Sequence, residues 1–334
     1  MINGHGDDIY NYGKKIVSNF SSNIYTRQDL SVLDNYLCSC IASIHSYPEP
    51  DAISLSRLIA DQNQAATNNI CITNGATEAI YMIAQAFRGK HSAVIQPTFS
   101  EYGDACLVND HIVSMVKSID DVPEQVDVVW LCNPNNPTGT VTDKERLKEY
   151  IISHPEKYIV IDQSYEYFTP KSLFAVSEAM QYKNVILLHS MTKRYAIPGL
   201  RLGYITACSE TVALISRYCM PWSVNGLAIE AGKFLLENGA EIINVEEYIA
   251  EAKRFHKILS QIERLEVYNT DTHFFLCRLT DKTASELKEY LIQKHGILIR
   301  DASNFHGLNE HYFRVATQSP QENDAFVKAI KEWI

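Results

Sequence analysis

The most informative stretch of the chain reads Val185-Ile186-Leu187-Leu188-His189-Ser190-Met191-Thr192-Lys193-Arg194-Tyr195-Ala196-Ile197-Pro198-Gly199-Leu200-Arg201. Its apolar start is typical of a buried strand, and the Pro-Gly pair marks a turn. A buried lysine such as Lys193 can lose its proton and form an imine, while Ser190 and Arg201 are suited to a phosphate. The alternative is a surface Lys-Arg pair beside a turn. The flanking residues favour one cofactor, pyridoxal phosphate, which carries both an aldehyde and a phosphate.

The composition is that of an ordinary soluble globular protein, with 46% hydrophobic and 21% charged residues in 334. The 30 basic and 40 acidic residues give a net charge of −10, so we expect no nucleic-acid partner. The polar N-terminus is unlike a signal peptide, and no apolar run approaches the ~18 residues of a membrane helix. The eight cysteines show no zinc-binding spacing. We therefore expect a cytoplasmic protein with reduced thiols, no metal site and no membrane contact.

Short apolar strands alternate with helices from about residue 68 to 208. The expected strands are Ile70–Thr73, Ala93–Gln96, Ile112–Val116, Val126–Cys132, Tyr158–Asp162, Val185–His189 and Leu202–Ala207. Amphipathic helices are predicted at Thr77–Phe87 and Lys144–Ser153, the second with a capping box between Thr142 and Glu145. This alternation predicts an α/β fold with a mostly parallel seven-stranded sheet covered on both faces.

The pattern changes after about residue 221 and predicts a smaller α+β domain. Its expected helices are Leu227–Leu236, Glu241–Ile262 and Thr283–Lys294, with a further helix at the C-terminus. Its expected strands are Glu266–Tyr268, Phe274–Leu279, Leu298–Arg300 and Phe313–Ala316. We predict an N-terminal arm over residues 1–25 that belongs to neither domain, a large domain over 26–222 and a small domain over 223–334.

Polar residues follow the carboxyl ends of the predicted strands, where ligands of parallel α/β sheets bind. Gly75 opens a helix whose free N–H groups suit an anion, and Phe99 could stack on a planar ring. A rigid loop rich in asparagine and proline contains Asn136. Asp162, 31 residues before Lys193, would be costly at a buried strand end without a cation, and a protonated pyridine nitrogen would supply one. Taken one at a time, the helix start, the aromatic residue and the turn each have an ordinary structural explanation.

In this order the features resemble the fold type I pyridoxal phosphate enzymes, the aminotransferase class I/II superfamily, over nearly the whole chain. The resemblance implies that Lys193 bonds to the cofactor, Asp162 holds its ring nitrogen, and Asn136 and Tyr165 bind its ring hydroxyl. It places Gly75, Ala76, Thr77, Ser190 and Arg201 around the cofactor phosphate and Phe99 on the ring. It makes Arg314 the clamp of the substrate α-carboxylate. Tyr47 would reach the cofactor phosphate of a partner subunit, which implies a homodimer with shared active sites.

Within the superfamily the chain is similar to two families, the threonine-phosphate decarboxylases and the histidinol-phosphate aminotransferases. His5-Gly6, Phe20-Ser21-Ser22-Asn23-Ile24 and Ile297-Leu298-Ile299-Arg300 favour the decarboxylases. That resemblance implies loss of CO2 from L-threonine O-3-phosphate in cobalamin biosynthesis. The alternatives are transamination of a phosphorylated or aromatic substrate and a non-catalytic binding protein or regulator with the same fold. His5, Asn23 and Arg300 are candidates for gripping the substrate phosphate. The ordinary alternative for His5 is that it lies in a mobile N-terminal arm. The ordinary alternative for Arg300 is that it forms an ion pair at a strand end. Gln163-Ser164 and Tyr25-Thr26 depart from the expected Glu-Ala and Asn-Pro.

Overall fold

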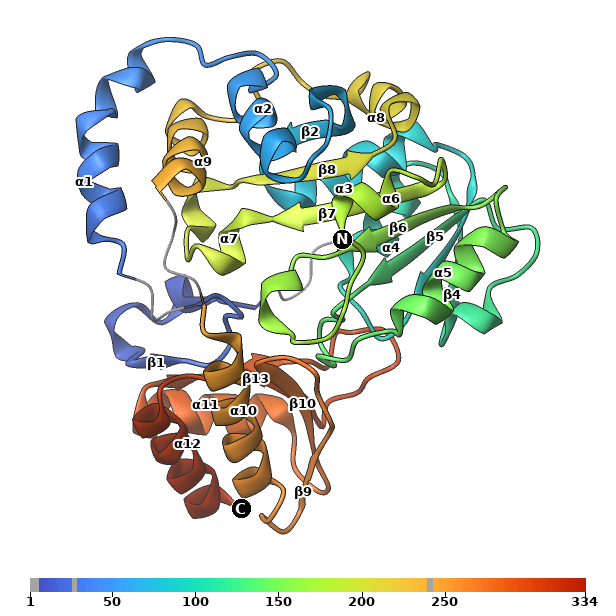
Figure 1. Cartoon of the computed structure of the whole chain (residues 1–334). Helices are drawn as coiled ribbons and strands as arrows, with labels where there is room; N and C mark the ends of the chain where they lie inside the picture. Colours follow the sequence, from blue (N-terminus) through green and yellow to red (C-terminus); the bar gives the residue numbers. More distant parts are fainter. Residues whose placement is uncertain (1–5, 26–28, 239–242) are drawn as a thin grey trace.

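Seven strands form the central sheet of the computed structural model, which describes residues 6–25, 29–238 and 243–334 (Figure 1). The strands are β2 (Ile70–Thr73), β3 (His91–Ile95), β4 (Ile112–Val116), β5 (Val128–Cys132), β6 (Tyr158–Asp162), β7 (Val185–Ser190) and β8 (Gly203–Ala207). Their order is β2-β8-β7-β6-β5-β3-β4. Strand β8 runs antiparallel to β2 and β7, and the other neighbours are parallel. The predicted mostly parallel, seven-stranded sheet is confirmed.

Helices cover both faces of this sheet. Successive side chains of a central strand such as β5 therefore pack into two different cores. Val128 and Trp130 pack in one core cluster, whereas Val129 and Leu131 pack in another. The helices of this large part are α1 (Ser31–Ser39), α2 (Ile53–Gln62), α3 (Gly75–Ala86), α4 (Glu101–Val108), α5 (Lys144–Ser153), α6 (Val176–Ala179), α7 (Met191–Arg194), α8 (Ser209–Ser216) and α9 (Gly226–Asn238). Strands buried on both sides explain the continuous apolar runs in the sequence.

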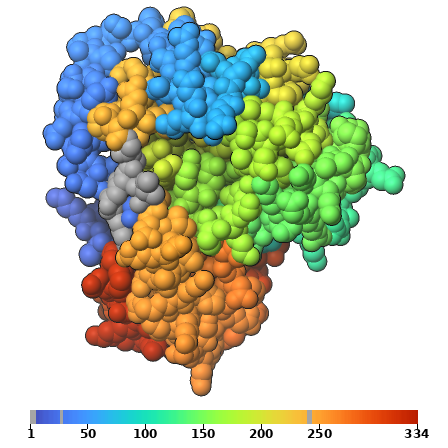
Figure 2. All heavy atoms as spheres, viewed as in Figure 1, coloured from blue at the N-terminus to red at the C-terminus, as the bar shows by residue number. Residues whose placement is uncertain are grey.

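The C-terminal part is an α+β unit below the large part, drawn in orange and red in Figures 1 and 2. Its antiparallel sheet has the order β12-β13-β10-β9. The elements are α10 (Val245–Leu259), β9 (Leu265–Val267), β10 (Phe274–Leu279), α11 (Ala284–His295), β11 (Ile297–Leu298), β12 (Arg300–Asp301), β13 (Tyr312–Ala316) and α12 (Pro320–Trp333). Residues 241–242 of the helix predicted over Glu241–Ile262 lie outside the described residues.

The single strand predicted at Leu298–Arg300 is wrong. The chain forms β11 before Ile299 and β12 after it, because the two segments pair with different partners. Strand β11 pairs with β1 (Ser18–Asn19), and β12 pairs with β13. Phe20, which follows β1, is fully buried in the core of the C-terminal part. The described part of the N-terminal arm therefore packs on the C-terminal part, while the domain boundaries stay predictions.

The capping box predicted for Thr142 and Glu145 is also wrong. Asp143 is the residue that caps α5, and its side chain accepts a hydrogen bond from the backbone N–H of Arg146. Thr142 is held in the preceding loop, where Asn133 bonds both its N–H and its C=O. The first residue free to cap the helix is therefore the aspartate one position later.

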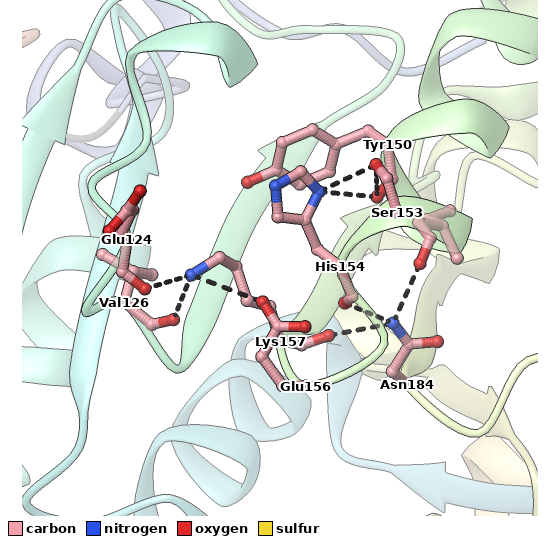
Figure 3. A network of polar contacts seen from close by, with 9 residues as sticks. Glu124, Val126, Tyr150, Ser153, His154, Glu156, Lys157 and Asn184 are labelled. Carbon is pink, nitrogen blue, oxygen red and sulfur yellow. Dashed lines mark hydrogen bonds and ion pairs between the residues drawn. The ribbon is translucent and has the colours of Figure 1, made fainter.

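The amino end of β6 is fixed by a buried lysine, Lys157, which is 3% exposed. Its Nζ donates to the carbonyl oxygens of Glu124 and Val126 and lies 3.8 Å from the Glu156 carboxylate (Figure 3). Asn184 donates to three carbonyls of the same corner. These bonds give the ammonium of Lys157 a structural role. Lys157 lies at the amino end of β6, whereas the candidate site residue Asp162 lies at the carboxyl end of the same strand.

Three features expected from composition can be compared with the structure. All eight cysteines are free thiols. Among the helices of the described ranges, none combines the length and apolar character that a membrane crossing requires. Within those same ranges, no group of three or more His, Cys, Asp or Glu side chains could hold a metal ion.

Candidate active site

A cavity of about 240 Å³ is lined by the carboxyl ends of the central strands, the N-terminal arm and β12 and β13. Twelve of the predicted site residues line it: Asn23, Ala76, Thr77, Phe99, Asn136, Asp162, Tyr165, Ser190, Lys193, Arg201, Arg300 and Arg314. Residues from strands far apart in the sequence thus meet in one place, as expected for the carboxyl edge of a parallel sheet.

Three predicted residues are not among those that line the cavity. Gly75 lies directly behind it, against Arg201. Tyr47 is 84% exposed and packs on Trp222, outside the cavity of its own chain. His5 lies outside the described residues.

Asp162 ends β6 as a buried carboxylate, 4% exposed. Its Oδ2 accepts a 2.7 Å hydrogen bond from the hydroxyl of Tyr102, and its Oδ1 accepts one of 2.8 Å from the backbone N–H of Ser164. Burial, followed by the charge of Asp162, raises the pKa of Tyr102 well above its usual value, so this phenol stays a donor. Both donors are neutral, so neither of them forms an ion pair with the carboxylate.

Lys193 lies in the short helix α7 that follows β7. Burial, with the nearby charges of Arg314 and Arg201, lowers the pKa of its ammonium to about 8. Roughly one lysine in ten then carries a free amine at pH 7. In contrast to Lys157, whose ammonium is bonded to carbonyls, Lys193 faces the cavity and is available for reaction.

The start of α3 and Arg201 lie together in the lining of the cavity and are suited to an anion. Gly75 has φ +79°, and a Cβ built on it would lie 2.6 Å from Nη2 of Arg201. The absence of a side chain therefore lets the guanidinium lie against the helix start, where Ala76 and Thr77 reach the cavity. Ser190 is close by in the lining and shares a 2.8 Å hydrogen bond with Thr192. Free N–H groups, hydroxyls and a guanidinium suit a phosphate.

Arg314 and Arg300 are neighbours in register on β13 and β12 and also line the cavity. Arg314 is 5% exposed, and burial lowers the pKa of its guanidinium to about 10. It donates to Oδ1 of Asn136 and to the carbonyl of Ser21, while its Nε has no hydrogen-bond partner among the described residues. Arg300 donates to Asn304 at 2.8 Å, and burial lowers its pKa. Among the described residues, neither guanidinium lies within ion-pair distance of a carboxylate.

Tyr165 lines the same cavity. Its hydroxyl accepts a 3.3 Å hydrogen bond from Nδ2 of Asn23, and burial raises its pKa to about 12, against the opposing pull of Arg314. Phe99 is partly buried, edge-on to Tyr102 at 5.8 Å. The lining of the cavity thus offers an aromatic ring, a phenol and an amide in addition to its cationic side chains.

The sequence interpretation missed several residues that line the cavity: Gly6, Asp7, Ser21, Ser22, Tyr102 and Ser164. Tyr102 lies three positions after Phe99, at the start of α4, so a helical turn brings both to the same side. That spacing was visible in the sequence. The arm residues had no such signal, because a segment without periodicity does not indicate where it will pack.

The comparisons with known proteins agree with this geometry. The sequence model of the family described as "Aminotransferase class I and II" matches residues 15–330. The chain belongs to the aminotransferase class I and II family. A threonine-phosphate decarboxylase of Salmonella typhimurium is similar to this family member, with 29% identity over 90% of this chain and 85% of the relative.

Two solved structures show how far the similarity extends for this member of the family. L-threonine-O-3-phosphate decarboxylase from Porphyromonas gingivalis superimposes with a TM-score of 0.92 at 38% identity, covering 95% of this chain and 99% of the other. Histidinol-phosphate aminotransferase from Clostridium acetobutylicum has a TM-score of 0.83 at 28% identity, with the same coverage. The fold type I architecture expected from the sequence is confirmed.

Proposed function

We propose that this protein is a pyridoxal phosphate enzyme that decarboxylates L-threonine O-3-phosphate to (R)-1-aminopropan-2-yl phosphate and CO2. The observation that carries the proposal is the pair of buried arginines, Arg314 and Arg300, opposite Lys193 in one cavity. Buried cations without a carboxylate partner are costly unless a ligand supplies the anion. Two such cations side by side call for a substrate that carries two anionic groups. Threonine phosphate carries a carboxylate and a phosphate.

The residues of the cavity fit pyridoxal phosphate. The cradle that Gly75 leaves open beside Arg201 suits the phosphate, and Ala76, Thr77 and Ser190 complete it. Asp162 suits a protonated ring nitrogen, because its carboxylate is buried and receives only neutral donors within the described chain. Asn136 and Tyr165 would hold the ring hydroxyl, and Phe99 would lie on the ring face. The bound cofactor supplies an electron-accepting ring to which the amino group of the substrate is joined.

Lys193 has two tasks in this proposal. Its lowered pKa provides the free amine that attaches the cofactor. In the loaded enzyme its amine would also lie next to Cα of the substrate, where it could hold or deliver a proton. Asp162 would hold a proton on the ring nitrogen of the bound cofactor, where its buried carboxylate could favour that charge.

The two arginines would decide which bond of Cα breaks. The bond perpendicular to the ring is the one whose electrons overlap the π system. Arg314 holds the α-carboxylate and Arg300, with Asn304, holds the phosphate, so rotation about the bond to Cα is fixed at two points. With His5 and Asn23 as further contacts, this grip would fix the orientation of the carboxylate and favour loss of CO2 over loss of the Cα proton.

The second candidate function is transamination by a histidinol-phosphate aminotransferase, which also acts on a phosphorylated amine. The similarity to the Clostridium acetobutylicum enzyme, with a TM-score of 0.83, supports it as the alternative. The same lysine, aspartate and arginines would serve that reaction if the Cα–H bond stood perpendicular to the ring instead.

One assay separates the two functions. Purified holoenzyme is incubated with threonine phosphate and no keto acid, and CO2 and aminopropanol phosphate are measured. We expect both products in equal amounts over many turnovers. The decarboxylase proposal is contradicted if no CO2 forms while histidinol phosphate and 2-oxoglutarate yield glutamate.

A homodimer completes the proposal. Large apolar side chains are exposed around helix α1, among them Val32, Ile41, Ile44, Tyr47 and Met220. Leu33 is the one residue of α1 that is buried in the single chain. An apolar surface of this kind is typical of a subunit interface, from which Tyr47 would reach the partner's cofactor phosphate. Light scattering of the purified protein should give twice the mass of 37.9 kDa.

We further propose that the reaction serves cobalamin biosynthesis in the cytoplasm. A relative from Leptospira interrogans whose name assigns it to adenosylcobalamin biosynthesis is 29% identical over 97% of this chain, which spans 40% of that relative. Eight free thiols are in keeping with a reducing compartment. A strain lacking the gene should require added aminopropanol phosphate to complete cobalamin.

A further inference from the structure

A largely buried hydrogen-bonded pair, Glu166 and His189, lies next to the site without lining its cavity. Nδ1 of His189, on β7, is 3.0 Å from Oε1 of Glu166, in the turn after β6. The two side chains are 2% and 19% exposed, the histidine being the more buried. An ionised carboxylate only accepts, so Nδ1 carries the proton of this bond. Nε2 shares a 3.0 Å hydrogen bond with the Thr206 hydroxyl, and both ring nitrogens are therefore used.

The pair joins two segments that each carry a residue of the site. Glu166 directly follows Tyr165 in the chain, and His189 directly precedes Ser190. Tyr165 and Ser190 both line the cavity. A bond between their neighbours therefore restricts how far the Tyr165 phenol and the Ser190 hydroxyl can move apart.

The central sheet no longer joins these segments at the level of the pair. Strands β6 and β7 are parallel neighbours whose register ends with Asp162 opposite Leu188. A backbone hydrogen bond of 2.8 Å from Gln163 to the Leu188 carbonyl extends the pairing by one residue. Tyr165 comes after this point, so its position relative to β7 depends on side-chain contacts such as the Glu166–His189 bond.

A second contact connects the same segments, one residue further along each. The guanidinium of Arg194 lies over the Tyr167 ring, 4.0 Å from its centroid. Arg194 follows Lys193 in the chain, and Tyr167 follows Glu166. The charge of Glu166, followed by burial, raises the pKa of the Tyr167 phenol, so this ring stays neutral beneath the cation. The turn after Tyr165 is thus connected to the segment of the reactive lysine at two points.

The imidazole of His189 has a fixed orientation because β8 holds it. Its ring stacks on the Tyr204 ring at 4.4 Å and 13°, and the two residues are partners in register. Thr206, which bonds Nε2, is fully buried on the same strand. A fixed imidazole fixes in turn the carboxylate that accepts from it.

Gln163, at one of the positions where the chain departs from the expected Glu-Ala, suits the same carboxylate. Its Nε2 donates to Oε2 of Glu166 at 3.4 Å and to the carbonyl of Phe174 at 3.1 Å. A glutamate at position 163 would bring a second carboxylate against Glu166, where like charges repel. The glutamine replaces this repulsion with a hydrogen bond, so the pair is in keeping with the particular sequence of this chain.

We propose that Glu166 and His189 are positioning residues of the active site, whose hydrogen bond sets the separation between the Tyr165 phenol and the Ser190 hydroxyl. The inference rests on the proposed function, because these two hydroxyls would hold the ring oxygen and the phosphate of the cofactor. Without the bond, the turn after β6 could move, and the phenol would no longer meet the ring oxygen at hydrogen-bond distance.

The test compares Glu166→Leu, which removes the acceptor, with Glu166→Gln, whose amide oxygen can still accept from His189. His189→Phe is made alone and together with Glu166→Leu, which shows whether the two side chains act as a unit. Glu251→Leu is the matched control, since Glu251 is 11% exposed and accepts from Arg254 and Asn323 in the C-terminal part. For each holoenzyme we measure the melting temperature, the pH midpoint of the visible absorption of the bound cofactor, and kcat/KM for threonine phosphate.

A donor to the ring oxygen favours its anionic form, so loss of that donor makes deprotonation harder. We therefore expect Glu166→Leu to raise the pH midpoint by about 0.5 to 1 unit and to lower kcat/KM about tenfold. Glu166→Gln should keep both near the wild-type values, and the double variant should lose no more than the worse of the two single variants. Glu251→Leu should lower the melting temperature alone.

Three results would overturn the inference. In the first, Glu166→Leu keeps the wild-type pH midpoint. In the second, the losses of the Glu166→Leu and His189→Phe variants add in the double variant. In the third, the losses only follow the melting temperature, as in the control. A wild-type protein with no visible band would instead refute the proposed cofactor, so the two failures are distinguishable.

Discussion

The hydroxyl of Tyr102 donates a 2.7 Å hydrogen bond to Oδ2 of Asp162, and the two side chains are 1% and 4% exposed. The bond fixes the carboxylate at the point where it would meet the ring nitrogen of the cofactor. Because burial keeps the Tyr102 phenol protonated, the bond persists across the working pH range.

Replacement of Tyr102 by phenylalanine should leave a buried carboxylate oxygen without its donor. Such a loss costs about 1–3 kcal/mol, so we expect kcat/KM to fall about tenfold while the cofactor remains bound. Tyr81→Phe is the matched control, since its hydroxyl also bonds a carboxylate, that of Glu101 at 2.9 Å, without lining the cavity. Equal losses of kcat/KM in both variants would show that the Tyr102 hydroxyl contributes to stability and not to the orientation of the Asp162 carboxylate.

The glycine at the start of α3 should be irreplaceable for a steric reason. In Gly75→Ala the new Cβ would lie 2.6 Å from the Arg201 guanidinium, at φ +79°. We expect the dissociation constant for pyridoxal phosphate, measured by titration of the apoprotein, to rise at least about tenfold. Gly89→Ala is the control, because Gly89 has φ +76° and nothing within 4 Å of its Cβ position. Its backbone strain should cost stability, about 1 kcal/mol, without changing cofactor affinity.

Arg300 should recognise the phosphate of the substrate and not its carboxylate. In Arg300→Gln we expect KM for threonine phosphate to rise at least about tenfold, because a charge-assisted contact is lost in a buried place. The cofactor absorption should be unchanged. Arg278→Gln is the control, since Arg278 lies on β10 of the same sheet and pairs with Glu266 at the surface. A wild-type KM in Arg300→Gln would show that Arg300 does not bind the substrate phosphate.

The lowered pKa of Lys193 predicts how cofactor attachment depends on pH. The reacting species is the free amine, so the rate at which the apoprotein takes up pyridoxal phosphate should rise about tenfold from pH 6 to pH 7 and level off above about pH 8. A lysine with the usual pKa of 10.5 would show a continued rise towards that value. Lys193→Ala should give no visible cofactor band at any pH, whereas Lys157→Met should lose stability and keep the band.

Most of the sheet and most of the cavity could be predicted from the sequence, because both depend on local patterns. Strands such as Tyr158–Asp162 are buried on both faces and read as continuous apolar runs, and the chemistry at their carboxyl ends follows in a fixed order. Tyr102 was missed although its spacing from Phe99 was visible, since a buried tyrosine alone does not indicate a carboxylate partner.

The remaining features depend on contacts between distant segments. Nothing in the sequence around Ser21 or Arg314 indicates that the two are in contact, because they are 293 residues apart. The break at Ile299 arises because its two flanking segments pair with different strands, one of them in the N-terminal arm. Neither the contact between distant residues nor the break at Ile299 could be predicted from the order of residues along the chain.

The most direct test of the account is the fate of the substrate carboxyl carbon. L-Threonine O-3-phosphate labelled with ¹³C at the carboxyl group is incubated with one equivalent of holoenzyme and no keto acid, and the products are followed by NMR. If Arg314 and Arg300 orient the substrate for loss of its carboxylate, the label appears in CO2 and bicarbonate in a single turnover. Label retained in a keto acid, with the amino group left on the cofactor, would contradict decarboxylation and establish transamination.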